Sequence, residues 1–270
     1  MENLLSDRVA FTIFGVDIYW YGVIITLAIV LDFIILIHLC KKFHLGSETP
    51  YDLLLYLVPL GIIGARLFSV LFDSGQSITD FFRFRDGGMS IIGGLMGGAL
   101  GLLIFCLIKK KNYLQMLDIM APLVILAQAI GRWGNYFNQE VYGRVVTNES
   151  LQWFPLAVEV YGTWHYALFF YECILNLLGF VLLISLFTIK QRKNGVIVAS
   201  YLCFYGAVRF VLEGFRDETY ILRLGTVPIS KIMSAVMFVI GLGIFIWLFA
   251  RTIINKRKER EERIYGKKSV

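Results

Sequence analysis

Charged residues are scarce in this sequence. Only 17% of its 270 residues are Asp, Glu, Lys or Arg, whereas 57% are hydrophobic, and the mean hydropathy is +0.68. A soluble domain of this size would carry roughly 25% charged and 45–50% apolar residues. The deficit of charge excludes an ordinary soluble domain, and the polar stretches between the apolar segments are too short for a second domain of usual size.

Metal-binding and disulfide patterns are missing as well. The four cysteines show no CxxC spacing, and each lies in or beside an apolar segment, so we predict neither a metal site nor disulfides and interpret them as buried small hydrophobic residues: Cys40, Cys106, Cys173 and Cys203. The N-terminal residues MENLLSDRVAFTIFGV lack the basic segment, apolar core and cleavage site of a secretory signal. We therefore do not expect a cleaved leader.

Long hydrophobic runs dominate the chain. Blocks of about 20 apolar residues, the length at which an α-helix crosses a hydrocarbon core, predict an all-α polytopic membrane protein. The seven expected spans lie at about 17–39, 51–72, 88–108, 113–136, 167–188, 195–214 and 229–250.

The connecting segments complete the expected organisation. The segment 137–166 alternates apolar with polar residues and is expected to form a small, strand-containing head region within a membrane domain of residues 1–250. Residues 251–270 are expected to form a basic tail. The segment VAFTIFGVDIYWYG at 9–22 is expected along the membrane interface, where Trp and Tyr are enriched. The chain shows no internal repeat, which disfavours an inverted-repeat transporter.

The basic residues predict the orientation. Sixteen of the 26 Lys and Arg residues fall in three connections, at 41–42, 109–111 and 190–193, and in the tail. The positive-inside rule predicts that these parts are cytoplasmic, and seven spans then place the N-terminus and the head region outside the cytoplasm. The net charge of +6 is accordingly interpreted as contact with anionic lipid headgroups, and no nucleic-acid binding is expected.

Ionisable residues inside the spans are the candidate functional residues, because each is costly at membrane depth. By the expected topology, six of them lie in the outer halves of their helices. Arginines outnumber acids in this set, which favours binding of an external anion over a purely structural ion-pair network: Arg66, Arg132, Glu172, Arg209, Glu213 and Arg216.

Spacing refines this prediction. Arg209, Glu213 and Arg216 occur at i, i+4 and i+7 and share a helical face, so Glu213 is expected to orient the arginines. Arg132, Asn135 and Asn138 are also aligned if the helix continues past Gly134. Because guanidinium groups match phosphate oxygens and Asn135, Asn138 and Gln139 suit a polyol, we predict a phospholipid-headgroup site.

The third span contains a glycine stripe, with Gly93, Gly97 and Gly101 at i, i+4 and i+8. Such a stripe favours close packing against a neighbouring helix backbone. A flat face that accepts an acyl chain is the alternative.

Several of these segments resemble motifs of the prolipoprotein diacylglyceryl transferase family, and the likeness runs nearly end to end. The segments that carry it are IYWYG (18–22), GARL (64–67), GGMSIIGGLMGG (87–98), GRWGNYFNQEVYG (131–143), HYALFFYE (165–172) and YGAVRFVLEGFR (205–216).

The resemblance implies an enzyme of the bacterial cytoplasmic membrane that needs no cofactor or metal. It would transfer the diacylglyceryl group of phosphatidylglycerol to the lipobox cysteine of prolipoproteins, forming a thioether and releasing glycerol phosphate, with its active site toward the outer leaflet. The motifs imply catalytic roles for Tyr21, Asn135, Glu140 and Arg209. They imply binding of phosphatidylglycerol by Arg132, Asn135 and Gly143, and we assign Asn138, Arg66, Glu213 and Arg216 to the same set.

The sequence departs from the family at two places. Ile92 stands where the family commonly has a histidine proposed as the base, and HYALFFYE lacks the usual proline after His165 and is one residue longer. The group that accepts the thiol proton is therefore open among Glu140, Tyr21, His165 and the departing phosphate. A transporter or a lipid-binding receptor without turnover remains the alternative function.

Overall fold

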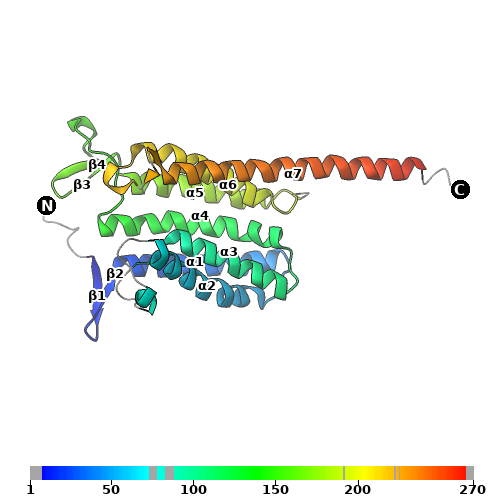
Figure 1. Ribbon diagram of the computed structural model, residues 1–270, viewed down its shortest axis with the longest axis horizontal. Coiled ribbons are helices and arrows are strands. Elements are labelled where there is room, and N and C mark those ends of the chain that lie inside the picture. The colour runs from blue at the N-terminus through cyan, green and yellow to red at the C-terminus, as the bar shows by residue number, and fades with distance from the viewer. Residues whose placement is uncertain are drawn as a thin grey trace. The chain divides into compact units, whose positions relative to one another are not determined.

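The computed structural model describes residues 8–72, 78–82, 88–190, 192–221, 223–224 and 226–265. Within these residues, seven helices are long and apolar enough to cross a membrane, so the predicted all-α polytopic fold is confirmed (Figure 1). They are α1 (Trp20–Lys42), α2 (Thr49–Phe72), α3 (Ile91–Ile108), α4 (Tyr113–Asn138), α5 (Leu168–Leu186), α6 (Val196–Leu212) and α7 (Ile229–Tyr265).

Two helices extend beyond the expected spans for different reasons. Helix α4 continues past Gly134 to Asn138, which is the condition under which Arg132, Asn135 and Asn138 share a face. Helix α7 continues to Tyr265, because the sequence after residue 250 is rich in Lys, Arg and Glu, which favour a helix but are too polar to span a membrane. The hydrophobicity of the sequence therefore predicts the membrane-spanning part of α7 but does not predict where the helix ends.

The chain divides into two compact units, which are described separately. Unit 1 comprises residues 1–32 and 120–270, and unit 2 comprises residues 33–119. Helices α1 and α4 each contribute one part to either unit.

In unit 2, α2 and α3 lie side by side (Figure 1) and approach at backbone distance along the glycine stripe. A methyl group on Gly93 or Gly97 would overlap a backbone carbonyl of α2, and one on Gly101 would lie 2.7 Å from the carbonyl oxygen of Tyr56. These three glycines therefore serve helix packing, as favoured, and do not form a face for an acyl chain. Gly98, by contrast, points into open space.

In unit 1, α6 packs against both α5 and α7. The α6–α7 contact again uses glycine: a methyl group on Gly206 would lie 2.7 Å from the carbonyl oxygen of Ser234, and one on Gly241 would lie 2.9 Å from that of Ala199. Such close approach is typical of membrane helices.

The expected strands of the head region are present. Strands β3 (Ala157–Val160) and β4 (Thr163–Tyr166) pair antiparallel, with Ala157 opposite Tyr166 and Val160 opposite Thr163. A short 3₁₀ turn, η3 (Glu149–Leu151), precedes them. A further two-residue pair, β5 (Arg223–Leu224) and β6 (Val227–Pro228), leads into α7.

The N-terminal segment forms a structure of its own, and its expected place along the membrane interface stays a prediction. Strands β1 (Val9–Ile13) and β2 (Val16–Tyr19) form an antiparallel hairpin directly before α1. The two turn residues, Phe14 and Gly15, both have positive φ, at 48° and 76°. Turns with two such residues match the natural twist of a hairpin. The aromatic composition indicated an interface but did not reveal this pairing.

Candidate functional site

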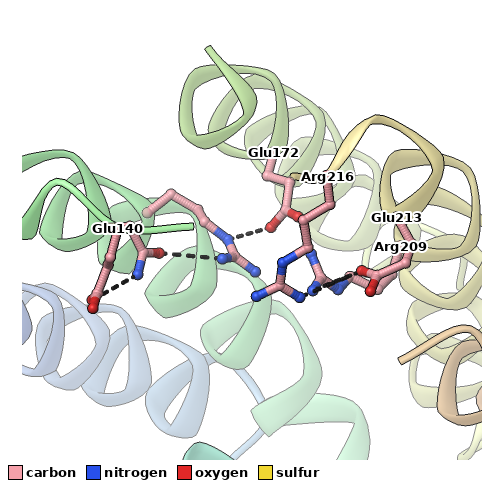
Figure 2. Close-up of polar contacts among 7 residues, drawn as sticks. Glu140, Glu172, Arg209, Glu213 and Arg216 are labelled. Carbon is pink, nitrogen blue, oxygen red and sulfur yellow. Dashed lines mark hydrogen bonds and ion pairs between the residues drawn. The ribbon is translucent and has the colours of Figure 1, made fainter. Parts of the chain in front are cut away.

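Polar side chains converge where α4 and α6 end and α5 begins, all within unit 1. Residues Glu213–Phe215 form a 3₁₀ turn, η4, that prolongs α6 by one short turn. We call the set Arg132, Glu172, Arg209, Glu213 and Arg216 the arginine cluster. Its labelled members turn toward one another in Figure 2, and Glu140 lies further along the same polar network.

Glu172 is the centre of the arginine cluster. Its carboxylate forms ion pairs with Nε of Arg132 through one oxygen and with Nη1 of Arg209 through the other. The Glu172 side chain is only 3% exposed. Because Arg132 belongs to α4, Glu172 to α5 and Arg209 to α6, this one carboxylate joins three helices.

Glu213 binds the second pair of arginines, as its spacing predicts. Its Oε2 lies 3.2 Å from Nη2 of Arg209 and 3.4 Å from Nη1 of Arg216. The change from α-helix to 3₁₀ turn at Glu213 does not separate the three side chains. Glu213 therefore orients both arginines.

A second network runs from Arg132 to Glu140. Nη1 of Arg132 donates to Oδ1 of Asn135 at 3.2 Å, and Nδ2 of Asn135 donates to Oε1 of Glu140 at 3.2 Å. Nδ2 of Asn138 donates to the same carboxylate oxygen at 3.1 Å. Four of the predicted site residues thus form one continuous chain of hydrogen bonds.

The backbone after α4 explains how Glu140 reaches this network. Gln139 adopts a left-handed conformation, with φ of 52°, of the kind that commonly ends a helix. The N–H of Glu140 then donates to the carbonyl oxygen of Asn135 at 3.0 Å. This reversal of the chain directs the Glu140 side chain back toward the C-terminal end of α4.

The arginine cluster contains more positively charged groups than negatively charged ones. Three guanidinium groups share two carboxylates directly, while Glu140 is linked to Arg132 only through Asn135. Nε of Arg216 is buried and has no hydrogen-bond partner among the described residues. Burial lowers the pKa of Arg216, and the positive charge of Arg209 lowers it further. An anion at this place would relieve both effects.

Tyr21 contacts the end of α4 from the first turn of α1. A methyl group on Gly134 would lie 2.6 Å from Cδ2 of Tyr21, so the missing side chain makes room for the ring. The adjacent Trp20 stacks on Phe137 with ring centroids 5.1 Å apart. This packing places the Tyr21 ring beside the end of α4 that carries Asn135 and Asn138.

Gly143 holds the head region against the segment that follows α6. Its N–H donates to the carbonyl oxygen of Tyr166 at 3.0 Å, and it forms a β-bridge with Arg216. A methyl group on Gly143 would lie 2.6 Å from Cβ of Tyr166 and 3.0 Å from the carbonyl oxygen of Phe215. This geometry gives Gly143 a role in placing Arg216, and its contact with substrate stays a prediction.

His165 is buried beside this junction. Its Nδ1 lies 2.9 Å from the carbonyl oxygen of Gly143 and 4.0 Å from Oδ2 of Asp217, and its ring packs on Tyr142 with centroids 4.3 Å apart. Burial raises the pKa of Asp217, but hydrogen bonds from Thr219 outweigh it, and the net pKa is lowered. Tyr142 and Asp217 were missed from the sequence, although both lie next to predicted site residues.

Arg66 belongs to unit 2 and is not part of the arginine cluster as described. Its guanidinium is almost fully buried, and it donates to the carbonyl oxygens of Gly88 at 2.7 Å and Phe81 at 3.3 Å. These bonds tie the residues on either side of 83–87 to α2. The predicted contact of Arg66 with phosphatidylglycerol stays a prediction. Ile92, also in unit 2, is exposed on α3.

The fold and the site define a class of protein: a multi-pass membrane protein with an arginine-rich polar site at the ends of three helices. Comparison with known proteins identifies the family. The sequence model of the prolipoprotein diacylglyceryl transferase family matches residues 8–247, and the chain belongs to this family.

Individual relatives agree over nearly their whole length. The chain is 36% identical over 238 residues to a phosphatidylglycerol–prolipoprotein diacylglyceryl transferase of Finegoldia magna, covering 87% of this chain and 93% of that one. It is 35% identical over 261 residues to such a transferase of Clostridium perfringens, covering 94% and 98%. It is 37% identical over 268 residues to one of Lactobacillus acidophilus, covering 95% and 94%.

Proposed function

We propose that this chain is a phosphatidylglycerol–prolipoprotein diacylglyceryl transferase of a bacterial cytoplasmic membrane. Family membership supports the reaction, and the arginine cluster supports the donor lipid. The observation that carries the assignment of the site is that three buried or half-buried arginines converge on two carboxylates and leave an N–H donor of Arg216 unpaired among the described residues. The phosphate of the lipid headgroup is the anion that this arrangement suits.

The reaction is a displacement at a glyceryl carbon. The thiolate of the lipobox cysteine forms the new C–S bond, and the C–O bond to the phosphate breaks with its electron pair leaving on glycerol phosphate. Arg216, together with Arg132 and Arg209, holds this phosphate, and the three guanidinium groups stabilise the negative charge that grows on its oxygen. Fixed charges of this kind are commonly the largest single contribution to catalysis.

The same arginines favour the nucleophile. A free thiol has a pKa of about 8.5, and neighbouring positive charge lowers it. The thiol proton goes to a base, and Ile92 cannot serve. We assign this role to Glu140, whose carboxylate lies next to the arginine cluster. Among the described residues, this carboxylate forms no ion pair with an arginine and accepts hydrogen bonds only from side-chain amides. Asn135 and Asn138 orient it.

The orientation in the membrane is part of the proposal. Basic connections at 41–42, 109–111 and 190–193 support a cytoplasmic location of those helix ends, by the positive-inside rule. The arginine cluster lies at the opposite ends of α4, α5 and α6, so it faces the outer leaflet, on the side to which prolipoproteins are exported.

Transfer of labelled diacylglyceryl from phosphatidylglycerol to a lipobox peptide tests the function. We expect the purified protein to convert the lipid and label the peptide, and Arg132→Ala to lower the rate by about 10²–10³-fold because one of the charges that stabilise the leaving group is lost. Arg144→Ala is the matched control, since Arg144 is exposed and pairs loosely with Glu218 at 3.8 Å. A transporter or a receptor would leave the lipid chemically unchanged, and that result would overturn the proposal.

A further inference from the structure

A second layer of polar side chains lies one helical turn away from the arginine cluster. On α4, Gln128 lies four residues before Arg132, and on α5, Asn176 lies four residues after Glu172. Side chains four residues apart share a helical face. Since α4 runs toward the cluster and α5 runs away from it, both residues lie about 6 Å deeper along their helices, toward the middle of the span.

Contacts on both sides of this layer fix the register of α4 and α5. Above it, Arg132 pairs with Glu172. Below it, a methyl group on Gly179 would lie 2.5 Å from Cδ1 of Ile125, so these two positions also face each other. In an antiparallel helix pair that keeps this register, Gln128 faces Asn176.

Both residues have polar atoms without partners. Asn176 is only 1% exposed, yet neither its Oδ1 nor its Nδ2 has a hydrogen-bond partner among the described residues. Nε2 of Gln128 donates to Oη of Tyr201 at 3.0 Å, but its Oε1 is buried and has no partner in the same part of the chain. Buried amides are normally hydrogen-bonded, because an unpaired one loses its hydration without compensation.

We propose that Asn176 and Gln128 bind the ester carbonyl groups of the diacylglyceryl donor. This inference rests on the proposed function. A phospholipid whose phosphate lies at the arginine cluster and whose chains follow the helices has its ester carbonyls a few bonds deeper, at the level of the two amides.

The chemistry of the two amides fits an ester. Ester carbonyls only accept hydrogen bonds, and Nδ2 of Asn176 is a donor without a partner in the described chain. When the hydroxyl of Tyr201 donates to Oε1 of Gln128, the amide of Gln128 turns its Nε2 toward the lipid as a second donor. This exchange keeps the bond between Gln128 and Tyr201 and gives each buried amide a partner.

The proposed contact predicts discrimination between ester and ether lipids. Diester phosphatidylglycerol and its dialkyl ether analogue share the headgroup and the chains, but the ether analogue has no carbonyl groups. We expect the wild-type protein to transfer the diester form with a kcat/KM about tenfold higher, the order of magnitude of one or two hydrogen bonds. Asn176→Leu, of similar size, lowers kcat/KM for the diester form and leaves the ether form unchanged, so that the ratio approaches one.

Controls make every outcome decisive. Leu178→Ala, at an exposed position of α5, keeps the wild-type ratio. Gel filtration and thermal unfolding in detergent establish that Asn176→Leu is folded, and if it is not, Gln128→Leu in the same assay takes its place. Equal use of the two lipids by the wild-type protein, as a buried water between the amides would give, overturns this inference, and so does an unchanged ratio in the variants. Absence of any transfer from diester phosphatidylglycerol contradicts the proposed function instead.

Discussion

The two units hold their helices together in different ways. In unit 2, α2 and α3 meet through glycine backbones, and the buried Arg66 binds carbonyl oxygens at the ends of a connection. In unit 1, α4, α5 and α6 are joined by the carboxylate of Glu172 and the arginines that it pairs with. Close packing of small residues needs no ligand. Buried ion pairs are poor at stabilising a fold, which is why we propose a functional role for those of unit 1.

The largest expected effect is the loss of transfer activity when an arginine of unit 1 is removed. Arg209→Ala takes away a charge that faces both Glu172 and Glu213. We expect transfer to the lipobox peptide to fall by about 10²–10³-fold, measured at saturating peptide. Arg251→Ala, which removes an exposed arginine of α7, provides the control. Loss of less than tenfold would mean that the arginine cluster serves the fold and not the reaction.

In unit 2, a substitution in the glycine stripe is expected to lower the stability of the protein and to leave its activity unchanged. Gly97→Ala places a methyl group against the carbonyl oxygen of Leu60. We expect it to destabilise the protein by about 1–3 kcal/mol, the usual cost of overpacking. The measurement is the midpoint of thermal unfolding in detergent. The KM for phosphatidylglycerol is expected to stay constant.

Gly98→Ala is the matched control for this prediction, because Gly98 lies next to Gly97 but faces open space. Its unfolding midpoint should equal or slightly exceed that of the wild type. Equal effects at the two positions would show that backbone flexibility, and not contact with α2, explains the role of the stripe.

The smallest expected effect concerns the head region. The hydrogen bonds from Thr219 lower the pKa of Asp217 in the folded protein, so the stabilisation is present above its usual pKa near 3.9 and is lost as the pH falls through the lower folded value. Asp217→Asn should therefore be less stable than the wild type at pH 6. The difference should be less than about 1 kcal/mol, because Asp217 and Thr219 interact near the surface. Denaturant unfolding from pH 6 to pH 3 should show this difference shrinking. A difference that grows on acidification would contradict the assignment.

Local patterns in the sequence predicted the helices and the pairs within them. The seven spans follow from apolar length, the pairing of Glu213 with Arg209 and Arg216 follows from helical spacing, and the role of Gly97 follows from its stripe. Each of these depends on one helix or on one repeated contact, which periodicity describes well.

Contacts between segments that are distant in the sequence could not be predicted from sequence patterns. That Glu172 binds arginines of two other helices depends on how α4, α5 and α6 pack. The return of Glu140 depends on the left-handed backbone at Gln139, a residue type that rarely adopts it. Asn176 gave no signal, because one amide in an apolar helix is informative only once its surroundings are known.

Binding of phosphatidylglycerol, compared with binding of diacylglycerol, tests the central claim most directly. The two lipids share their chains and esters and differ in the phosphate that the arginine cluster is proposed to hold. We predict that the wild-type protein binds phosphatidylglycerol at least tenfold more tightly, and that Arg132→Gln removes the difference without weakening the binding of diacylglycerol. Equal affinity of the wild-type protein for both lipids would contradict the account.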